Sequence, residues 1–315
     1  MRWGTLVGMS APKRQFTGSN LRIRRDVSLA PLTTLELGGT AQAFAEIDDV
    51  ATAPEAVRWA RRHDMPLAII GGGSNLVIAD QGFAGAGIRF RMRGIEIDAA
   101  GDRALLTASA GEPWDELIAT TVSQGLAGLE CLSGIPGWVG ATPIQNVGAY
   151  GQEVAGVIER VRVLDLTSLE ERTIAREACS FSYRTSTFRE FPGRYLILSV
   201  TFALQRGGRP KVEYRELRRA LGISRAVPSL QEVRSAVLEL RRAKSMVIEE
   251  SDPNRRSVGS FFVNPVVSAD RLAALDEGVK ASGLRPGDES LPFFPADGGA
   301  FKVPAAWLIE KAGFS

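Results

Sequence analysis

The chain has 315 residues, of which 44% are hydrophobic and 23% are charged, and its formal net charge is +2 at pH 7. These values are typical of a globular protein of about two domains that can bury its own core, so they exclude wholesale disorder. Two cysteines and one histidine are too few for a disulfide scaffold or a histidine-rich metal site. We therefore expect no metal site, and the near-neutral charge predicts no nucleic-acid partner.

The N-terminus is basic, with six arginines and lysines and no acidic residue in residues 1–25. Such an arm can touch anionic partners, but we expect residues 1–25 to be a disordered extension, as is usual for chain ends of this kind. The chain has no signal-peptide pattern and no apolar run of about 18 residues. We therefore expect no membrane span and a cytoplasmic location.

Regular hydrophobic patterning begins at Leu35 and indicates an α+β fold. It predicts a strand over 41–47, a helix over 54–63 and a strand over 67–70, which together form a βαβ unit. Further strands are predicted at 76–79, 87–90, 95–99, 104–108, 157–166 and 195–204, and further helices at 114–124, 230–243 and 272–279. A turn rich in glycine, at 206–210, precedes the more helical part of the chain. We therefore divide the chain after the extension into domains 26–207 and 208–315.

Three consecutive glycines, Gly71, Gly72 and Gly73, precede Ser74 and Asn75. Successive backbone N–H groups in such a turn form a concavity that binds anions, and the two polar side chains add donors. The following residues are not a helix, which excludes a Walker loop and a dinucleotide fingerprint. The pattern alone fits either a phosphate site or a tight hairpin turn.

A second glycine-rich stretch spans residues 125–151, of which seven are glycine. Isoleucine, valine and tryptophan lie between the glycines, so the stretch is not a flexible linker. An irregular backbone inside a core leaves polar groups that a bound ligand can pair. We favour a cofactor-binding loop over a purely structural one.

Five motifs in a fixed order are similar to those of the UDP-N-acetylenolpyruvoylglucosamine reductase family, over about residues 33–314. They are GGGSN at 71–75, GIPGWVGATPIQNVGAY at 134–150, SYRTSTF at 182–188, GSFFVNP at 259–265 and PAAWLIEKAGF at 304–314. GGGSN alone is shared across a wide flavin family, whereas the ordered set is specific.

The resemblance implies a vanillyl-alcohol-oxidase (PCMH)-type FAD-binding domain of two α+β subdomains and a smaller α+β substrate-binding domain. It implies noncovalent FAD, with the diphosphate embraced by Gly71–Asn75. The residues implied to line the rest of the cofactor are Gly134, Ile135, Pro136, Gly137, Gly140, Ala141, Asn146, Gly148, Ala149 and Tyr150.

The resemblance further implies a reaction in peptidoglycan synthesis. NADPH reduces the flavin, flavin N5 delivers hydride to C3 of the enolpyruvyl group of UDP-N-acetylglucosamine-enolpyruvate, and a proton is added at C2 to give UDP-N-acetylmuramate. Arg184 is implied to polarise the substrate carboxylate, and Ser260 to donate the proton. The substrate-binding residues implied are Tyr183, Tyr214, Arg241, Lys244 and Asn264. We expect a monomer.

The family continues past the last motif with a segment that carries a late glutamate, whereas this chain ends at Ser315. We expect a truncated version of the full protein, and Glu310 does not replace that glutamate. Two alternatives stay open: another vanillyl-alcohol-type flavin oxidoreductase, or a non-catalytic FAD-binding remnant. Cys131 and Cys179 are expected to be reduced and structural.

Overall fold

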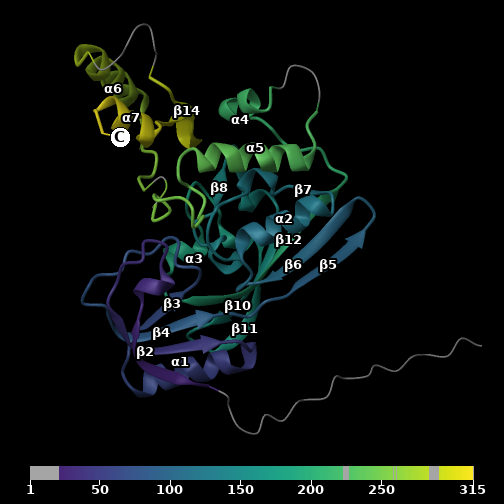
Figure 1. The fold of residues 1–315 in the computed structure, drawn as a ribbon, viewed down its shortest axis with the longest axis vertical. Coiled ribbons are helices and arrows are strands. Elements are labelled where there is room, and N and C mark those ends of the chain that lie inside the picture. The colour runs from purple at the N-terminus through teal and green to yellow at the C-terminus, as the bar shows by residue number, and fades with distance from the viewer. Residues whose placement is uncertain (1–20, 223–226, 258, 260, 284–290, 315) are drawn as a thin grey trace, which may run out of the picture. The chain divides into compact units, whose positions relative to one another are not determined.

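The computed structural model describes residues 21–222, 227–257, 259, 261–283 and 291–314. The chain divides into two compact units, with the division between Arg241 and Arg242. Figure 1 labels helices and strands of both units. None of the helices in these described ranges is long and apolar enough to cross a membrane.

The first unit begins with a four-stranded sheet in the order β1-β2-β4-β3. Its strands are β1 (Ile23–Ser28), β2 (Thr40–Ile47), β3 (Leu67–Ile70) and β4 (Phe83–Phe90), and α1 (Ala53–Arg62) connects β2 to β3. Both β2 and β3 are parallel to β4, so the predicted βαβ unit is confirmed, with β4 lying between its two strands. Ala60 of α1 packs against Ala43 and Ala86 on one face of this sheet.

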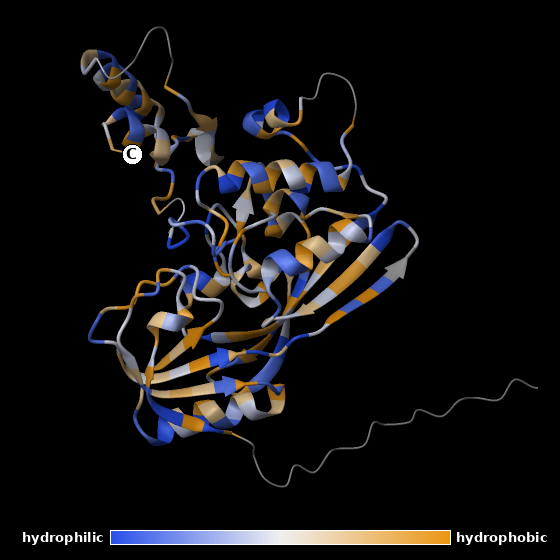
Figure 2. Cartoon of the chain, viewed as in Figure 1, coloured by the Kyte–Doolittle hydropathy of each residue, from blue (hydrophilic) through white to orange (hydrophobic). Residues whose placement is uncertain are grey.

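A second, antiparallel sheet has the order β11-β10-β12-β6-β5. Its strands are β5 (Ile95–Ala100), β6 (Arg103–Ser109), β10 (Ile158–Asp165), β11 (Glu170–Ala175) and β12 (Tyr195–Arg206), and β7 (Leu126–Ala127) pairs with β12. Figure 2 shows hydrophobic and hydrophilic positions alternating along β5, as expected for a strand with one buried face. One core joins the two sheets, because Phe90 of the first sheet belongs to the same buried cluster as Leu106 and Phe202 of the second.

The remaining elements of the first unit surround these sheets. They are α2 (Trp114–Ser123), α3 (Thr187–Glu190), α4 (Arg215–Ala220), α5 (Leu230–Arg242), the two-residue strands β8 (Gly148–Ala149) and β9 (Gln152–Glu153), and 3-10 turns at Ala30–Leu32, Val50–Thr52, Glu130–Leu132, Val139–Ala141, Val154–Gly156 and Arg176–Cys179. The predicted helices 54–63, 114–124 and 230–243 are therefore confirmed within one or two residues.

The second unit is small. It contains a three-stranded sheet, β13-β15-β14, made of β13 (Val266–Val267), β14 (Phe294–Pro295) and β15 (Phe301–Lys302), a 3-10 turn at Asp297–Gly299, and the helices α6 (Ala269–Ala281) and α7 (Ala305–Lys311). Ser268 caps α6 by accepting a hydrogen bond from the Arg271 N–H.

Two sequence expectations differ from these observations. The run 76–79 is not a strand, because Leu76 and Ile78 bury their side chains against the first sheet while the backbone stays irregular. The expected extension 1–25 overlaps β1, in which Arg25 stacks on Trp59. Residues 1–20 lie outside the described part.

The compact units also divide later than the expected boundary between residues 207 and 208. The reason is the apolar stripe of α5: Val233 and Val237 are buried in one cluster with Cys131 and Leu217. The same helix is tied to α2 by a bidentate ion pair, in which Arg234 donates to both carboxylate oxygens of Asp115 at 2.6 and 2.7 Å.

Asp115 has a second partner, since its Oδ1 also accepts a hydrogen bond from the Gly134 N–H at 2.6 Å. Burial alone raises the pKa of this carboxyl, but the bonds from Arg234 and Gly134 and the charge of Arg241 outweigh burial and hold the pKa below its usual value. One carboxylate therefore joins α2, α5 and the glycine-rich loop.

We predict that Asp115→Asn lowers the free energy of unfolding of the first unit by about 1–2 kcal/mol at pH 7, a value at the lower end for charge-assisted bonds because the carboxylate is partly exposed. A depressed folded-state pKa gives stability that is complete above the unfolded value of about 4 and is lost as the pH falls through the folded-state value. The stability difference between wild type and variant, measured by urea denaturation from pH 7 to pH 3, should therefore shrink on acidification. A difference that stays constant would contradict the assignment.

Candidate active site

The GGGSN turn leaves the carboxyl end of β3 and runs against the backbone of the 3-10 turn Ala30–Leu32. Gly73 has φ 71°, its carbonyl accepts a hydrogen bond from the Thr34 N–H at 3.2 Å, and a Cβ at this position would lie 1.8 Å from the Leu32 carbonyl oxygen. Only glycine fits there. The prediction that no helix follows this turn is confirmed.

The same turn also touches the second glycine-rich stretch, about 60 residues later in the chain. A Cβ on Gly72 would lie 2.8 Å from the Gly137 Cα, and one on Gly137 would lie 2.7 Å from the Ser74 Oγ. The Ser74 hydroxyl donates to the Pro136 carbonyl at 3.0 Å, and the Asn75 amide donates to the Gln145 Oε1 at 3.3 Å. In this structure the two polar side chains of the turn therefore bind the neighbouring loop.

Gly71 is different from its two neighbours. Its φ is not positive, and a Cβ on this residue would have the Ala141 Cβ as its nearest neighbour, at 3.9 Å. The protein itself therefore places no demand for glycine at this position. Open space beside Gly71, in a glycine turn at the end of a parallel strand, fits a phosphate-bearing cofactor, so the residues present here fit FAD.

The glycine-rich loop is held rigidly by the elements around it. Gly134 is bound by Asp115, the Gly137 carbonyl accepts from the Trp114 N–H at 3.0 Å, and the Gly140 N–H donates to the Ala110 carbonyl at 2.9 Å. Deeper in the loop, the buried Glu130 carboxylate accepts from Gly128 and from Gln152, each at 2.7 Å. These contacts agree with the expectation of a rigid loop rather than a linker.

The two cysteines, Cys131 and Cys179, belong to the buried clusters of the first unit. Both are free and buried, and burial raises the pKa of each thiol to about 12. They are structural residues, as expected.

The SYRTSTF turn is joined to the glycine-rich loop by side chains. The Asn146 amide donates to the Ser182 carbonyl at 3.0 Å, and the Ser186 hydroxyl donates to the Ile144 carbonyl at 2.7 Å. Arg184 itself has φ 57°, in the left-handed region, and its Nη2 donates to the Gly148 carbonyl at 2.8 Å. The motif arginine is thus placed beside a residue that the resemblance assigns to the cofactor, and its guanidinium carbon lies 5.9 Å from the centroid of the Tyr183 ring.

Two tyrosines and an arginine expected in the site also lie close together. The rings of Tyr150 and Tyr214 meet edge to face with centroids 5.6 Å apart, so Tyr214 lies at the glycine-rich loop. Burial lowers the pKa of the Arg241 guanidinium, while Tyr150 and Asp115 act in the opposite direction.

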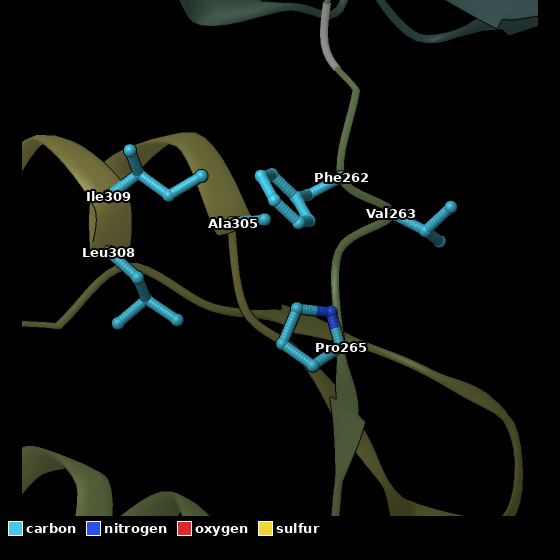
Figure 3. A pocket seen from close by; sticks show the side chains of 6 residues that line it. All are labelled: Phe262, Val263, Pro265, Ala305, Leu308 and Ile309. Atoms are coloured by element: carbon cyan, nitrogen blue, oxygen red, sulfur yellow. The ribbon is translucent and has the colours of Figure 1, made fainter. Parts of the chain in front are cut away.

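The remaining site residues belong to the second unit or lie outside the described residues. Asn264 accepts the Ala305 N–H at 2.9 Å and so caps α7, Lys244 is exposed, and Ser260 lies outside the described residues. An apolar cavity of about 310 Å³ adjoins the GSFFVNP motif (Figure 3). It is lined by Phe262, Val263, Pro265, Ala305, Leu308 and Ile309.

Sequence reasoning missed three residues of this region: Asp115, Glu130 and Arg89, the last of which stacks on Trp138. A single acidic or basic residue in a helix or strand carries no pattern that points to a distant loop. Within the described residues no group of three or more histidine, cysteine, aspartate or glutamate side chains is placed to hold a metal ion.

Comparisons with known proteins agree with this geometry. Residues 41–169 match the family model of an FAD binding domain. UDP-N-acetylenolpyruvoylglucosamine reductase from Saccharopolyspora erythraea is 46% identical over 294 residues, which is 91% of this chain and 78% of that protein. The protein of the same name from Streptomyces coelicolor is 44% identical over 312 residues, covering 98% of this chain and 79% of that protein.

The crystal structure of UDP-N-acetylenolpyruvylglucosamine reductase from Thermus caldophilus superposes with a TM-score of 0.55 at 22% identity, covering 93% of this chain and 94% of that one. This likeness concerns the fold, and the α+β fold with an FAD-binding domain is confirmed. The sequence identities go further: the chain belongs to the UDP-N-acetylenolpyruvoylglucosamine reductase family of FAD-dependent oxidoreductases.

Proposed function

We propose that this protein reduces the enolpyruvyl group of UDP-N-acetylglucosamine-enolpyruvate with NADPH and forms UDP-N-acetylmuramate for peptidoglycan synthesis. The proposal follows the names of the relatives. The observation that supports it is the hydrogen bond from Arg184 to Gly148, because a guanidinium beside the loop proposed for the cofactor is able to bind a substrate carboxylate. Two free, buried cysteines suit a reducing compartment, and we assign the protein to the cytoplasm.

FAD, when bound, supplies the hydride chemistry of this reaction. Gly71, Gly72 and Gly73 would hold its diphosphate through their N–H groups. The rest of the cofactor would lie along the glycine-rich loop, against Ile135, Pro136, Gly140, Ala141 and the segment 146–150. Asp115 and Glu130 support this role because they fix the loop before the cofactor arrives.

Arg184 would bind the substrate carboxylate. Its left-handed backbone and the bond to Gly148 hold the guanidinium in one orientation, and the planar fork can still bind two carboxylate oxygens. Charge that develops beside this carboxylate during reduction is then stabilised by a cation already in place. Tyr183 would close the pocket beside it.

Ser260 would donate the proton to C2. A hydroxyl is a weak acid, so it serves only where the receiving carbon is strongly basic, as it is in an enolate. Lys244, Arg241 and Asn264 would contact the substrate, and Tyr214 would stack on the uracil ring.

Replacement of Gly71 tests the cofactor site directly. Gly71→Ala should leave the apoprotein as stable as wild type or raise its stability by about 0.4–1 kcal/mol, because neither φ nor space opposes a methyl group. The same methyl group should weaken FAD binding about tenfold or more, as measured by flavin fluorescence quenching. Gly278→Ala is the matched control, because Gly278 also lacks a positive φ and has no atom near an added Cβ, and it lies in α6, away from the loop. Unchanged FAD affinity in Gly71→Ala would contradict the proposed diphosphate site at Gly71, Gly72 and Gly73.

The reaction is tested by anaerobic mixing, first with NADPH and then with UDP-N-acetylglucosamine-enolpyruvate. Wild type should bleach and then recover its flavin absorbance. Ser260→Ala should bleach at the wild-type rate and recover about 100-fold or more slowly, because only the second half-reaction needs the proton. Ser251→Ala, an exposed serine of the same unit, is the control.

Equal losses in both half-reactions of Ser260→Ala would remove Ser260 from the proton-transfer role. Bleaching of wild type without recovery would indicate a non-catalytic FAD-binding remnant, and direct reduction by an alcohol would indicate another vanillyl-alcohol-type flavin oxidoreductase.

Arg184→Lys tests the bidentate clamp. A lysine keeps the charge but not the fork, so turnover should fall about 100-fold while reduction by NADPH stays unchanged. Arg176→Lys is the matched control, since Arg176 is also an arginine that donates to a backbone carbonyl of this unit, that of Ala155. Near-normal turnover in Arg184→Lys would eliminate the clamp.

A further inference from the structure

Arg89 occupies a strand position next to the GGGSN turn. It lies on β4 in register with Ile70 of β3, the residue that directly precedes Gly71. The neighbours of Arg89 in sequence, Ile88 and Phe90, are buried in the core shared with α1. Because side chains alternate along a strand, Arg89 projects from the opposite face of the sheet, on the same side as the buried ring of Phe44 and the Ile70 side chain.

The guanidinium of Arg89 is stacked and partly desolvated. It lies over the Trp138 ring, 4.4 Å from the centroid. Its Nε is buried and has no hydrogen-bond partner among the residues that the structure describes. The nearby carboxylate of Glu46 already pairs with Arg24 at 3.2 Å and with Arg91 at 3.4 Å.

Trp138 lies between two features, because it contacts both the Arg89 guanidinium and the GGGSN turn. The indole belongs to the glycine-rich loop, and a Cβ on Gly72 would lie 3.1 Å from its Cδ1 atom. The indole therefore contacts the Arg89 guanidinium over its ring and the glycine turn at its Cδ1 atom. A buried N–H without an acceptor costs free energy, and an acceptor supplied by a ligand removes that cost.

We propose that Arg89 binds the diphosphate of FAD, as the charged partner of the Gly71–Gly73 amides, with Trp138 holding its guanidinium in place. This inference rests on the proposed binding of FAD. Backbone amides alone offer partial charges to a diphosphate, whereas an arginine offers a full charge and a planar fork. Burial favours an anionic partner for Arg89, because it disfavours an uncompensated charge. Burial also lowers the pKa of Arg89, with the charge of Glu46 opposing this effect and that of Arg91 adding to it.

The test measures FAD affinity of the apoprotein by flavin fluorescence quenching, over a series of salt concentrations. Arg89→Met should bind FAD about tenfold or more weakly than wild type, and its affinity should depend less on salt, because one charge contact is gone. Arg89→Lys should fall between the two. Arg25→Met is the matched control: Arg25 of β1, in the same sheet, has its guanidinium carbon 5.3 Å from the ring centroid of Trp59 in α1, and its loss should leave FAD affinity within about twofold.

The melting temperature of each apoprotein separates binding from packing. A purely structural role predicts that Arg89→Met lowers the melting temperature as Arg25→Met does and leaves the salt dependence of FAD binding unchanged, and that result would overturn the inference. FAD affinity of Arg89→Met within about twofold of wild type would overturn it as well. If the methionine variant does not fold, Arg89→Lys decides by the same two measurements. Wild-type apoprotein that takes up no FAD would overturn the proposed function, and this inference with it.

Discussion

Two backbone segments of the first unit touch where neither has a side chain, at Gly72 and Gly137. The close approach of the GGGSN turn to the glycine-rich loop depends on this contact. It brings the end of a parallel strand against an irregular loop, and Ser74 then binds Pro136. A methyl group on either glycine would separate the segments. Phosphate groups are large and fully hydrated in water, so a site for them needs amides that are already fixed in place.

Two carboxylates hold the glycine-rich loop that meets this turn. Asp115 holds Gly134, and Glu130 holds Gly128 and Gln152. Backbone N–H groups that have no partner in a strand or helix are thereby satisfied, so the loop keeps one conformation without regular secondary structure. The same Asp115 anchors α5, whose last residues connect to the second unit. Loop and helix are therefore stabilised by one charged group.

Much of the fold could be predicted because its elements follow simple periodicity, as in α1 and α5, and because their apolar stripes are the faces that become buried. The packing of α5 on the first unit could not, since Val233 and Val237 pack against Cys131, a partner about 100 residues away that no local pattern reveals. The glycine-rich motifs could also be predicted, because a backbone conformation or close approach that only glycine tolerates is visible in the residue type itself. The role proposed for Arg89 could not be predicted, because it depends on a contact with Trp138, which belongs to a distant part of the chain.

The bonds between the two glycine segments span 62 residues in one case and 70 in the other. Closure of such long loops is entropically costly and comes after local strands and helices have formed. During synthesis on the ribosome, the first 90 residues can build the four-stranded sheet, because β4 lies between β2 and β3, but they present only half of the proposed nucleotide site. Cofactor capture therefore has to wait until the segment around Gln145 has been made and has packed. Flavin binding is therefore a late step in the biogenesis of this protein.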